Sequence, residues 1–355
     1  MDNLKISEIE KYKNKDFGDS HLKLKFSNCH YSILNSLRRV AISQVPIYAF
    51  DVSKIKVLKN TSVYNNSQLE LRISQLPIPN INHDIDYLEH KYYFNVDFND
   101  VKEKHPKDTF DIDYYVKSIN NGDELVKYVT TNDLKVNINN EEINYNDENP
   151  ILLIKLRQGE EVEFSAKASL SIGETNSIFN ASSCYYNELD EDNMEFTVKS
   201  NRQLSEYTIL LKSCEILVQK MILFKELLSK QDSSKIENDK MFIMNIDNED
   251  YTLMNPINYF LQNSDKVEFC GIARYNGFLE KNIRLKIKTK NNLSPIDEIE
   301  KAIDKSIDTY RFIRDELENL DKGKTKSKKE ILKEESKEET KEEKPVKKTV
   351  KKSKK

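Results

Sequence analysis

Two adjacent arginines, Arg38 and Arg39, interrupt the apolar segment "YSILNSLRRVAISQVPIYAFD" at residues 31–51. A guanidinium group can bind phosphate, carboxylate or an aromatic face, so this pair could serve nucleic acid, a catalytic site or another protein. The 355-residue chain has a net charge of -4, and its last 35 residues contain 15 Lys against 8 Asp and Glu. Those residues contribute +7, so the remainder carries -11 and has no basic footprint for nucleic acid.

Two acidic clusters offer a second kind of chemistry. Asp111 and Asp113 lie in "DTFDIDY", and Asp190 and Asp192 lie in "ELDEDN". Paired carboxylates can hold the metal ions of a nuclease, so a metal-dependent enzyme that acts on nucleic acid is the alternative function. The first cluster follows an alternating pattern typical of a strand, and the second is typical of a turn. We therefore expect solvated carboxylates at an edge strand and a turn rather than a metal site.

Other residue types that carry chemistry are sparse or badly spaced. The seven glycines form no phosphate-binding loop, and no histidine stands at a ligand or triad spacing. The four cysteines contain no C-x-x-C pair, which predicts reduced thiols in an intracellular compartment: Cys29, Cys184, Cys214 and Cys270. No apolar run approaches the roughly 18 residues of a membrane span. We expect no catalytic residue, no cofactor, no metal and no membrane.

The elements that position the arginines occur twice in the chain. The segment "LKLKFSNCHYSILN" (22–35) aligns with "FIMNIDNEDYTLMN" (242–255) without a gap, and we call this alignment the first internal match. In both copies an alternating pattern predicts a strand, and the apolar spacing then becomes helical. The predicted helices carry matching apolar stripes: Ile33, Leu37, Val40 and Ala41 in the first copy, and Leu253, Ile257, Phe260 and Leu261 in the second.

A second internal match is also ungapped. It aligns "MEFTVKSNRQLSEYTILLKSC" (194–214) with "IRLKIKTKNNLSPIDEIEKAI" (283–303), continues along the helices that follow, and reads in both copies as a strand followed by a helix. Ser205 and Ser294 stand where helix N-caps belong, and Pro295 takes the favoured first helical position. The chain is thus predicted to consist of two similar halves.

The two halves differ by a large insertion in the first. This insertion is rich in strand patterns, among them "LLIKLRQGEEVEFSA", which predicts a hairpin with a turn at Gln158 and Gly159. The predicted organisation is a first dimerisation half at 1–50 and 194–228, an inserted β-rich domain at 51–193, a linker at 229–240, a second dimerisation half at 241–320, and a disordered Lys-rich tail at 321–355. The fold class is α+β.

Each half alone would expose an apolar helix stripe. Two tethered halves with matching stripes are expected to bury them against one another, as symmetric dimers do, which gives a pseudo-dimer within one chain. On a helical projection Arg39 falls on the side opposite the stripe, and Arg38 falls at its edge. We therefore expect Arg39 to point away from the contact between the halves.

The segment "ILNSLRRVAISQVPIYAFD" resembles the signature helix of the α-like subunits of DNA-directed RNA polymerases. The likeness continues through "NTSVYNNSQLELRISQLPI", "PILLIKLRQGEEVEFSA" and "MEFTVKSNRQLSEYTI", which are similar to the eukaryotic third subunit, and "NEDYTLMNPINYFLQNSDKVEFCGI" resembles its partner, the eleventh subunit. The sequence departs from the family at Met254, where the partner subunit has glycine, and it has no four-cysteine zinc loop.

This resemblance implies a fusion of both subunit types into one intramolecular pseudo-heterodimer, a fusion that suggests a large DNA virus. The implied role is a non-catalytic assembly subunit, a platform for the largest and second-largest polymerase subunits and smaller subunits, which meets DNA only through the complex. Arg38 and Arg39 are the expected partner-binding residues. Arg39 matches the arginine implicated in binding the second-largest subunit, and Arg38 is expected mainly to anchor the helix by hydrogen bonds to nearby carboxylates or carbonyls. The implied location is intracellular: the host cytoplasm (viral factory) or virion, with the nucleus as the alternative.

Overall fold

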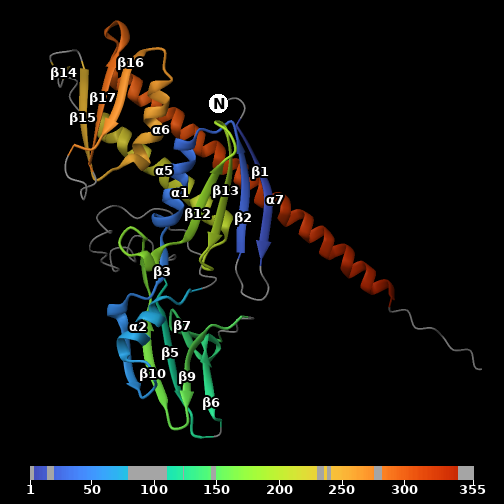
Figure 1. Ribbon diagram of the computed structural model, residues 1–355. Coiled ribbons are helices and arrows are strands. Elements are labelled where there is room, and N and C mark those ends of the chain that lie inside the picture. Colours follow the sequence, from blue (N-terminus) through green and yellow to red (C-terminus); the bar gives the residue numbers. More distant parts are fainter. Residues whose placement is uncertain are drawn as a thin grey trace, which may run out of the picture.

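The computed structural model describes residues 4–13, 20–78, 110–122, 124–144, 149–229, 236–237, 241–275 and 282–342. Two small sheets lie in the upper part of the molecule, with helices between them, and a β-rich domain lies below (Figure 1). The long helix near the C-terminus runs across the helical layer and extends beyond the body.

The first half consists of a four-stranded antiparallel sheet and two helices. The strand order is β1 (Lys5–Lys13), β2 (Ser20–Ser27), β13 (Asn193–Ser200) and β12 (Ser182–Glu188). Helix α1 (Tyr31–Ser43) follows β2, and α5 (Glu206–Ser229) follows β13. Alternate residues of β2 are fully buried, since one face of the sheet packs on the helices.

The second half repeats this arrangement. Its strand order is β14 (Ile236–Glu237), β15 (Met241–Asp247), β17 (Asn282–Thr289) and β16 (Val267–Ala273), with α6 (Tyr251–Gln262) after β15 and α7 (Pro295–Glu342) after β17. A single 3₁₀ turn, η4 (Lys290–Asn292), precedes α7.

The two internal matches hold residue by residue in the structure. Strand β13 pairs with β2 so that Asn193 faces Ser27, and the equivalent strands pair so that Asn282 faces Asp247. The backbone also repeats its unusual conformations: Asn28 and Asn248 have φ of 58° and 63°, and Arg202 and Asn291 have φ of 72° and 56°. These are the left-handed turns that lead from strand to helix in each unit, so the duplication extends to local geometry.

The predicted helix starts are confirmed. The Ser205 hydroxyl accepts a hydrogen bond from the Thr208 amide at 3.1 Å, and the Ser294 hydroxyl accepts one from the Asp297 amide at 3.4 Å. Each serine thereby satisfies an amide that has no partner within its helix.

The inserted domain has its own architecture. Its elements are β3 (Ile47–Ala49), η1 (Val52–Lys54), β4 (Ile55–Asn60), α2 (Asn66–Ser74), β5 (Ile112–Ile119), β6 (Val126–Thr130), η2 (Thr131–Asp133), β7 (Lys135–Ile138), β8 (Glu141–Asn144), β9 (Leu152–Arg157), β10 (Glu161–Lys167), β11 (Ser169–Ser171) and η3 (Ser177–Phe179). The main sheet has the order β4-β10-β5-β7-β8, and β6-β9 and β11-β3 form two-stranded sheets.

Two separate hydrophobic cores follow from this arrangement. One core runs through both halves and includes the buried faces of both four-stranded sheets and of α1, α5, α6 and α7. The other lies within the inserted domain, around residues such as Phe50, Tyr114 and Phe164. The halves therefore share one core, and most of the insert's apolar surface lies in the second. Ile47 and Ala49 of β3 and Phe179 of η3 belong to the first core and connect the insert to the halves.

Several predicted boundaries differ from the structure. Strand β12 belongs to the sheet of the first half rather than to the insert, because it pairs along its whole length with β13 and buries Cys184 against the shared core. A tight turn forms at Gly159 as predicted, with φ of 79°, but β9 and β10 pair with different strands, so the predicted hairpin is wrong. An alternating pattern predicts a strand and its buried face, but it does not predict which strand pairs with it.

The predicted linker and tail also differ in part. Ser229 is the last residue of α5, and Ile236–Glu237 pair with β15; residues 230–235 and 238–240 lie outside the described residues. Helix α7 continues to Glu342, well past the predicted start of disorder at residue 321. Lys and Glu are strong helix formers, and the ion pair of Lys322 with Glu318, four residues apart, supports the helix where it passes residue 321. Residues 343–355 lie outside the described residues.

Among the described residues, no helix combines the length and the apolar character needed to cross a membrane.

Candidate functional site: the seam between the halves

We use "seam" for the contact of α1 and α5 in the first half with α6 and α7 in the second. Helix α1 packs on α6, and α5 packs on α7. The structure buries seven of the eight predicted stripe residues almost completely, and Phe260 is partly buried against the same core: Ile33, Leu37, Val40, Ala41, Leu253, Ile257, Phe260 and Leu261. The two apolar stripes thus lie in one core.

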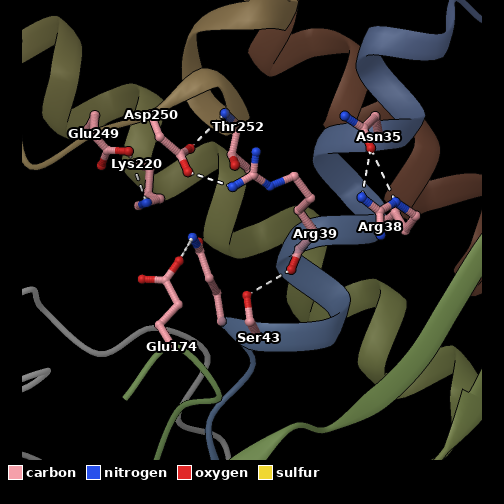
Figure 2. Close-up of polar contacts among 10 residues, drawn as sticks. Asn35, Arg38, Arg39, Ser43, Glu174, Lys220, Glu249, Asp250 and Thr252 are labelled. Atoms are coloured by element: carbon pink, nitrogen blue, oxygen red, sulfur yellow. Dashed lines mark hydrogen bonds and ion pairs between the residues drawn. The ribbon is translucent and has the colours of Figure 1, made fainter. Parts of the chain in front are cut away.

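Arg39 lies at the seam and not on the opposite side of α1. Its Nη2 atom is 2.6 Å from Oδ2 of Asp250, the N-cap residue of α6, and Figure 2 shows the guanidinium directed at this carboxylate. The other oxygen of Asp250 accepts the Thr252 amide at 2.7 Å. The predicted outward direction of Arg39 is therefore wrong. A helical projection gives only the direction in which a side chain leaves the helix, whereas the long side chain of Arg39 reaches the end of the neighbouring helix.

The equivalent contact on the other side of the seam is aromatic. In the first internal match, position 30 corresponds to position 250 and position 39 to position 259. The rings of His30 and Tyr259 stack with their centroids 4.2 Å apart and their planes at 17°. His30 is the N-cap of α1, where its Nδ1 accepts the Ser32 amide at 3.3 Å. Each helix therefore sends a side chain to the cap of the other, as a two-fold interface requires.

Two ion pairs join α5 and α7, and they are also equivalent to each other. Arg314 Nη1 lies 2.9 Å from Glu215 Oε2, and Lys225 Nζ lies 2.6 Å from Asp304 Oδ1. The second internal match relates Lys225 to Arg314 and Glu215 to Asp304, so the same charges occur at both positions. All four side chains are partly or largely exposed, and each pair contributes little to stability on its own.

Two further polar contacts cross the seam at buried or partly buried positions. Lys220 on α5 is only 8% exposed, and its Nζ lies 3.1 Å from Oε2 of Glu249, just before α6 (Figure 2). The hydroxyl of Tyr310 on α7 is buried and donates to the Ile33 carbonyl of α1 at 3.1 Å. Burial raises the pKa of Tyr310 well above its ordinary value, so this hydroxyl stays protonated and remains a donor.

Arg38 has a local role within α1. Its Nε and Nη2 atoms donate to Oδ1 of Asn35, one helical turn earlier, at 3.1 and 3.0 Å (Figure 2). The guanidinium also lies near β12, where it favours the charged forms of Cys184 and Tyr186, although burial dominates and raises the pKa of Cys184 to about 11. Arg38 is half-buried on the surface of the first half.

The acidic clusters make structural contacts. Asp111 lies 2.7 Å from Lys167 Nζ across the insert sheet. Asp190 accepts the amides of Asp192 and Asn193 and the side-chain amide of Asn193, which closes the turn between β12 and β13. These hydrogen bonds, the Asn193 side chain first, lower the pKa of Asp190. In the described ranges, no three His, Cys, Asp or Glu side chains gather as metal ligands would.

Sequence reasoning missed the cap residues His30, Asp250 and Tyr259. The signal that could have revealed them is the first internal match itself, because it aligns Arg39 with Tyr259 and His30 with Asp250. An isologous contact joins position i to position j and j to i, so the complementary types at these positions indicate that they face each other.

The fold and the seam define a protein built from two related dimerisation domains that pair within one chain. Two family models match, both described as the RNA polymerase Rpb3/Rpb11 dimerisation domain, at residues 23–221 and 242–316. The chain belongs to this family and contains one such domain in each half.

Similar proteins include polymerase subunits from a virus and a plant. The chain is 23% identical over 339 residues to a putative DNA-directed RNA polymerase subunit, R470, of Acanthamoeba polyphaga mimivirus, an alignment that covers 88% of this chain and 93% of the relative. It is 33% identical over 78 residues to subunit 3 of DNA-directed RNA polymerases II, IV and V of Arabidopsis thaliana, which covers 22% of this chain and 24% of the relative. The similarity to the viral protein thus extends through both halves and the insert.

Proposed function

We propose that this protein is the α-like assembly subunit of a multisubunit DNA-directed RNA polymerase and that it performs no catalysis itself. The observation that carries this proposal is the shared core: two domains of the Rpb3/Rpb11 dimerisation family bury their helix stripes together within one chain. Such a pair forms a rigid platform, because neither half can move without exposing the apolar surface of the other.

The partners proposed are the two largest polymerase subunits, which would assemble on this platform together with smaller subunits. Arg39 supports a partner contact as well as the seam. Its side chain is 39% exposed, and of its guanidinium nitrogens only Nη2 has a hydrogen-bond partner among the described residues. The remaining donors of the guanidinium can meet a partner subunit, and arginine is enriched where protein interfaces derive most of their affinity.

Similarity to a mimivirus protein along most of the chain supports a viral origin, and therefore transcription inside an infected cell. Whether the complex works in a cytoplasmic factory, in the virion or in the nucleus is decided by locating the tagged protein during infection. The alternative, a metal-dependent enzyme that acts on nucleic acid, has no geometric support from the acidic clusters, which are held in a turn and an ion pair.

The decisive experiment is purification of the tagged chain from cells that produce it together with its natural partners, followed by mass spectrometry. We expect the largest and second-largest subunits of one RNA polymerase in near-stoichiometric amounts. A magnesium-dependent nuclease assay on the isolated protein serves as the counter-test. Nuclease activity with no polymerase subunit recovered would overturn the proposal in favour of the alternative.

A further inference from the structure

The polar contacts of the seam fall into two classes once the internal duplication is taken into account. The ion pairs between α5 and α7 carry the same charges at both equivalent positions: Lys225 corresponds to Arg314, and Glu215 to Asp304. If two first halves from different chains paired with each other, Lys225 of one would still face Glu215 of the other. These ion pairs therefore cannot distinguish one kind of pairing from another.

The contacts at the starts of α1 and α6 are different, because the two equivalent positions hold unlike residues. Arg39 meets Asp250, whereas the equivalent Tyr259 meets His30. Pairing of two first halves would bring Arg39 against a second His30, and pairing of two second halves would bring Tyr259 against a second Asp250. Either kind of like pairing would therefore lose both the Arg39–Asp250 ion pair and the His30–Tyr259 stack.

The buried contact of Lys220 with Glu249 discriminates in the same way. The second internal match relates Lys220 to Thr309, and the first relates Glu249 to Cys29. In a pair of first halves, the ammonium of Lys220 would lose the Glu249 carboxylate and face a cysteine instead. Burial raises the pKa of Cys29 to about 12, so its thiol is neutral and cannot replace the carboxylate. A buried cation that loses a carboxylate partner is destabilised.

We propose that Arg39–Asp250, His30–Tyr259 and Lys220–Glu249 form a pairing code that restricts the seam to one first half with one second half. The apolar stripes and the α5–α7 ion pairs stabilise like and unlike pairs of halves alike. The three asymmetric contacts exclude like pairing, because they separate charges from their present partners in both alternatives. Unlike pairing is thereby enforced by side chains and not only by the covalent connection between the halves.

The code concerns the seam alone, so it holds whether or not the chain assembles a polymerase. To test it, a specific protease site is placed within residues 230–235 of the full chain, and the folded protein is cleaved there. Isotopically labelled and unlabelled cleaved proteins are mixed at low concentration so that fragments exchange, and native mass spectrometry then counts the pairs. We expect pairs of unlike fragments to exceed like pairs by at least roughly tenfold, about 1.4 kcal/mol.

Two substitutions at neighbouring positions on α5 provide a matched comparison. Lys220→Met removes the cation that opposes pairing of first halves, and we expect like pairs of the first fragment to rise several-fold. Lys225→Met removes the same charge from a contact that is equivalent on both sides. A pair of first fragments contains two such Lys225 contacts, an unlike pair contains one and a pair of second fragments contains none. This control is therefore expected to lower pairs of first fragments relative to unlike pairs, the opposite of the change expected for Lys220→Met.

A gain-of-function variant tests the code from the other side. Tyr259→Arg together with Thr309→Lys gives the second half the cation positions of the first while it keeps Asp250 and Glu249. This variant is expected to form several-fold more pairs of second-half fragments than the parent protein. The proposal is overturned if the cleaved parent protein forms like and unlike pairs in statistical proportion, or if Lys220→Met and Lys225→Met give the same ratio. If the double variant does not fold, the comparison of the two α5 variants decides the outcome.

Discussion

Arg38 and Arg39 are neighbours in sequence but hold different partners. Arg38 donates to Asn35 within its own helix, whereas Arg39 bridges two helices through the Asp250 carboxylate, which is 8% exposed. Arg39→Ala is expected to lower the free energy of unfolding by about 1 kcal/mol, because Asp250 keeps its capping bond but loses a charged partner. Urea unfolding measures this loss. The same substitution is expected to weaken capture of the second-largest polymerase subunit in a pull-down.

A matched variant separates these two effects of Arg39. Asp250→Asn keeps an oxygen that can accept the Thr252 amide but removes the charge that holds the guanidinium. It should cost a similar amount of stability and leave capture intact, since the guanidinium remains available to a partner. Equal loss of capture in both variants would mean that Arg39 acts through the seam and contacts no partner itself.

Tyr310 is a second residue at which the seam can be tested, because its hydroxyl can be removed while the ring stays in place. Tyr310→Phe removes one buried hydrogen bond and leaves the Ile33 carbonyl of α1 without that donor. The carbonyl keeps its partner within the helix, so the cost is that of one buried hydrogen bond, about 0.5 to 1.5 kcal/mol, and the unfolding midpoint should fall. Chemical unfolding with fluorescence or circular dichroism measures the change. A variant as stable as the parent would contradict the role of this bond.

What sequence alone predicts at this scale depends on the length of the side chain. The stripe residues, such as Leu37 and Ile257, lie where helical periodicity places them, because a short apolar side chain stays near its own Cα. The direction of Arg39 could not be derived in this way, since its guanidinium lies several bonds from the helix axis and follows the nearest carboxylate. That carboxylate belongs to a residue 211 positions away.

At the scale of elements, the start of α1 depends on the protonation state of His30. Its Nδ1 accepts the Ser32 amide, so the cap requires the neutral ring with its proton on Nε2. Burial lowers the pKa of His30 in the folded protein, while Asp192 opposes this shift. As pH falls, His30 is therefore protonated at a higher pH in the unfolded chain than in the folded protein. The stability from the neutral cap is complete above the unfolded value of about 6.5 and is lost as pH falls through the folded pKa.

We therefore expect the free energy of unfolding to decrease between about pH 7.5 and pH 5.5. His30→Asn supplies a cap that does not titrate, although it loses the stack on Tyr259. This variant should show a flatter dependence on pH than the parent across that interval. Urea unfolding at both pH values measures the difference, and an unchanged slope in His30→Asn would assign the titration to another group.

The order of strands and helices was predictable because each strand–helix unit occurs twice. The same change from strand spacing to helical spacing of apolar residues is therefore seen in both copies. The serine caps and the first helical proline marked the starts of α5 and α7 correctly. Pairing between distant strands was not predictable in the same way. Strand β12 joins the sheet of the first half, and β9 pairs with β6 rather than with its neighbour β10. The alternation of side chains fixes which face is buried, but tertiary packing chooses the neighbouring strand.

At the scale of the whole molecule, the two cores predict how the protein unfolds. Both halves contribute to a single core, whereas most of the buried apolar residues of the insert form a core of their own. Elements that share a core lose stability together, because a cavity in one part removes contacts from the other. The halves should therefore behave as one cooperative unit although they lie far apart in sequence, and the insert should behave as a second unit.

Hydrogen exchange of two variants tests this division. Leu37→Ala leaves a cavity in the shared core and is expected to cost about 2 to 5 kcal/mol, with faster exchange in β2 and β13 and also in β15 and β17. Protection of β5 and β10 should not change. Phe164→Ala, in the core of the insert, is expected to give the reverse pattern at a cost of about 3 to 5 kcal/mol. If Leu37→Ala accelerated exchange only in the first half, the halves would be separate folding units, and the seam would be a contact between two finished domains rather than the centre of one.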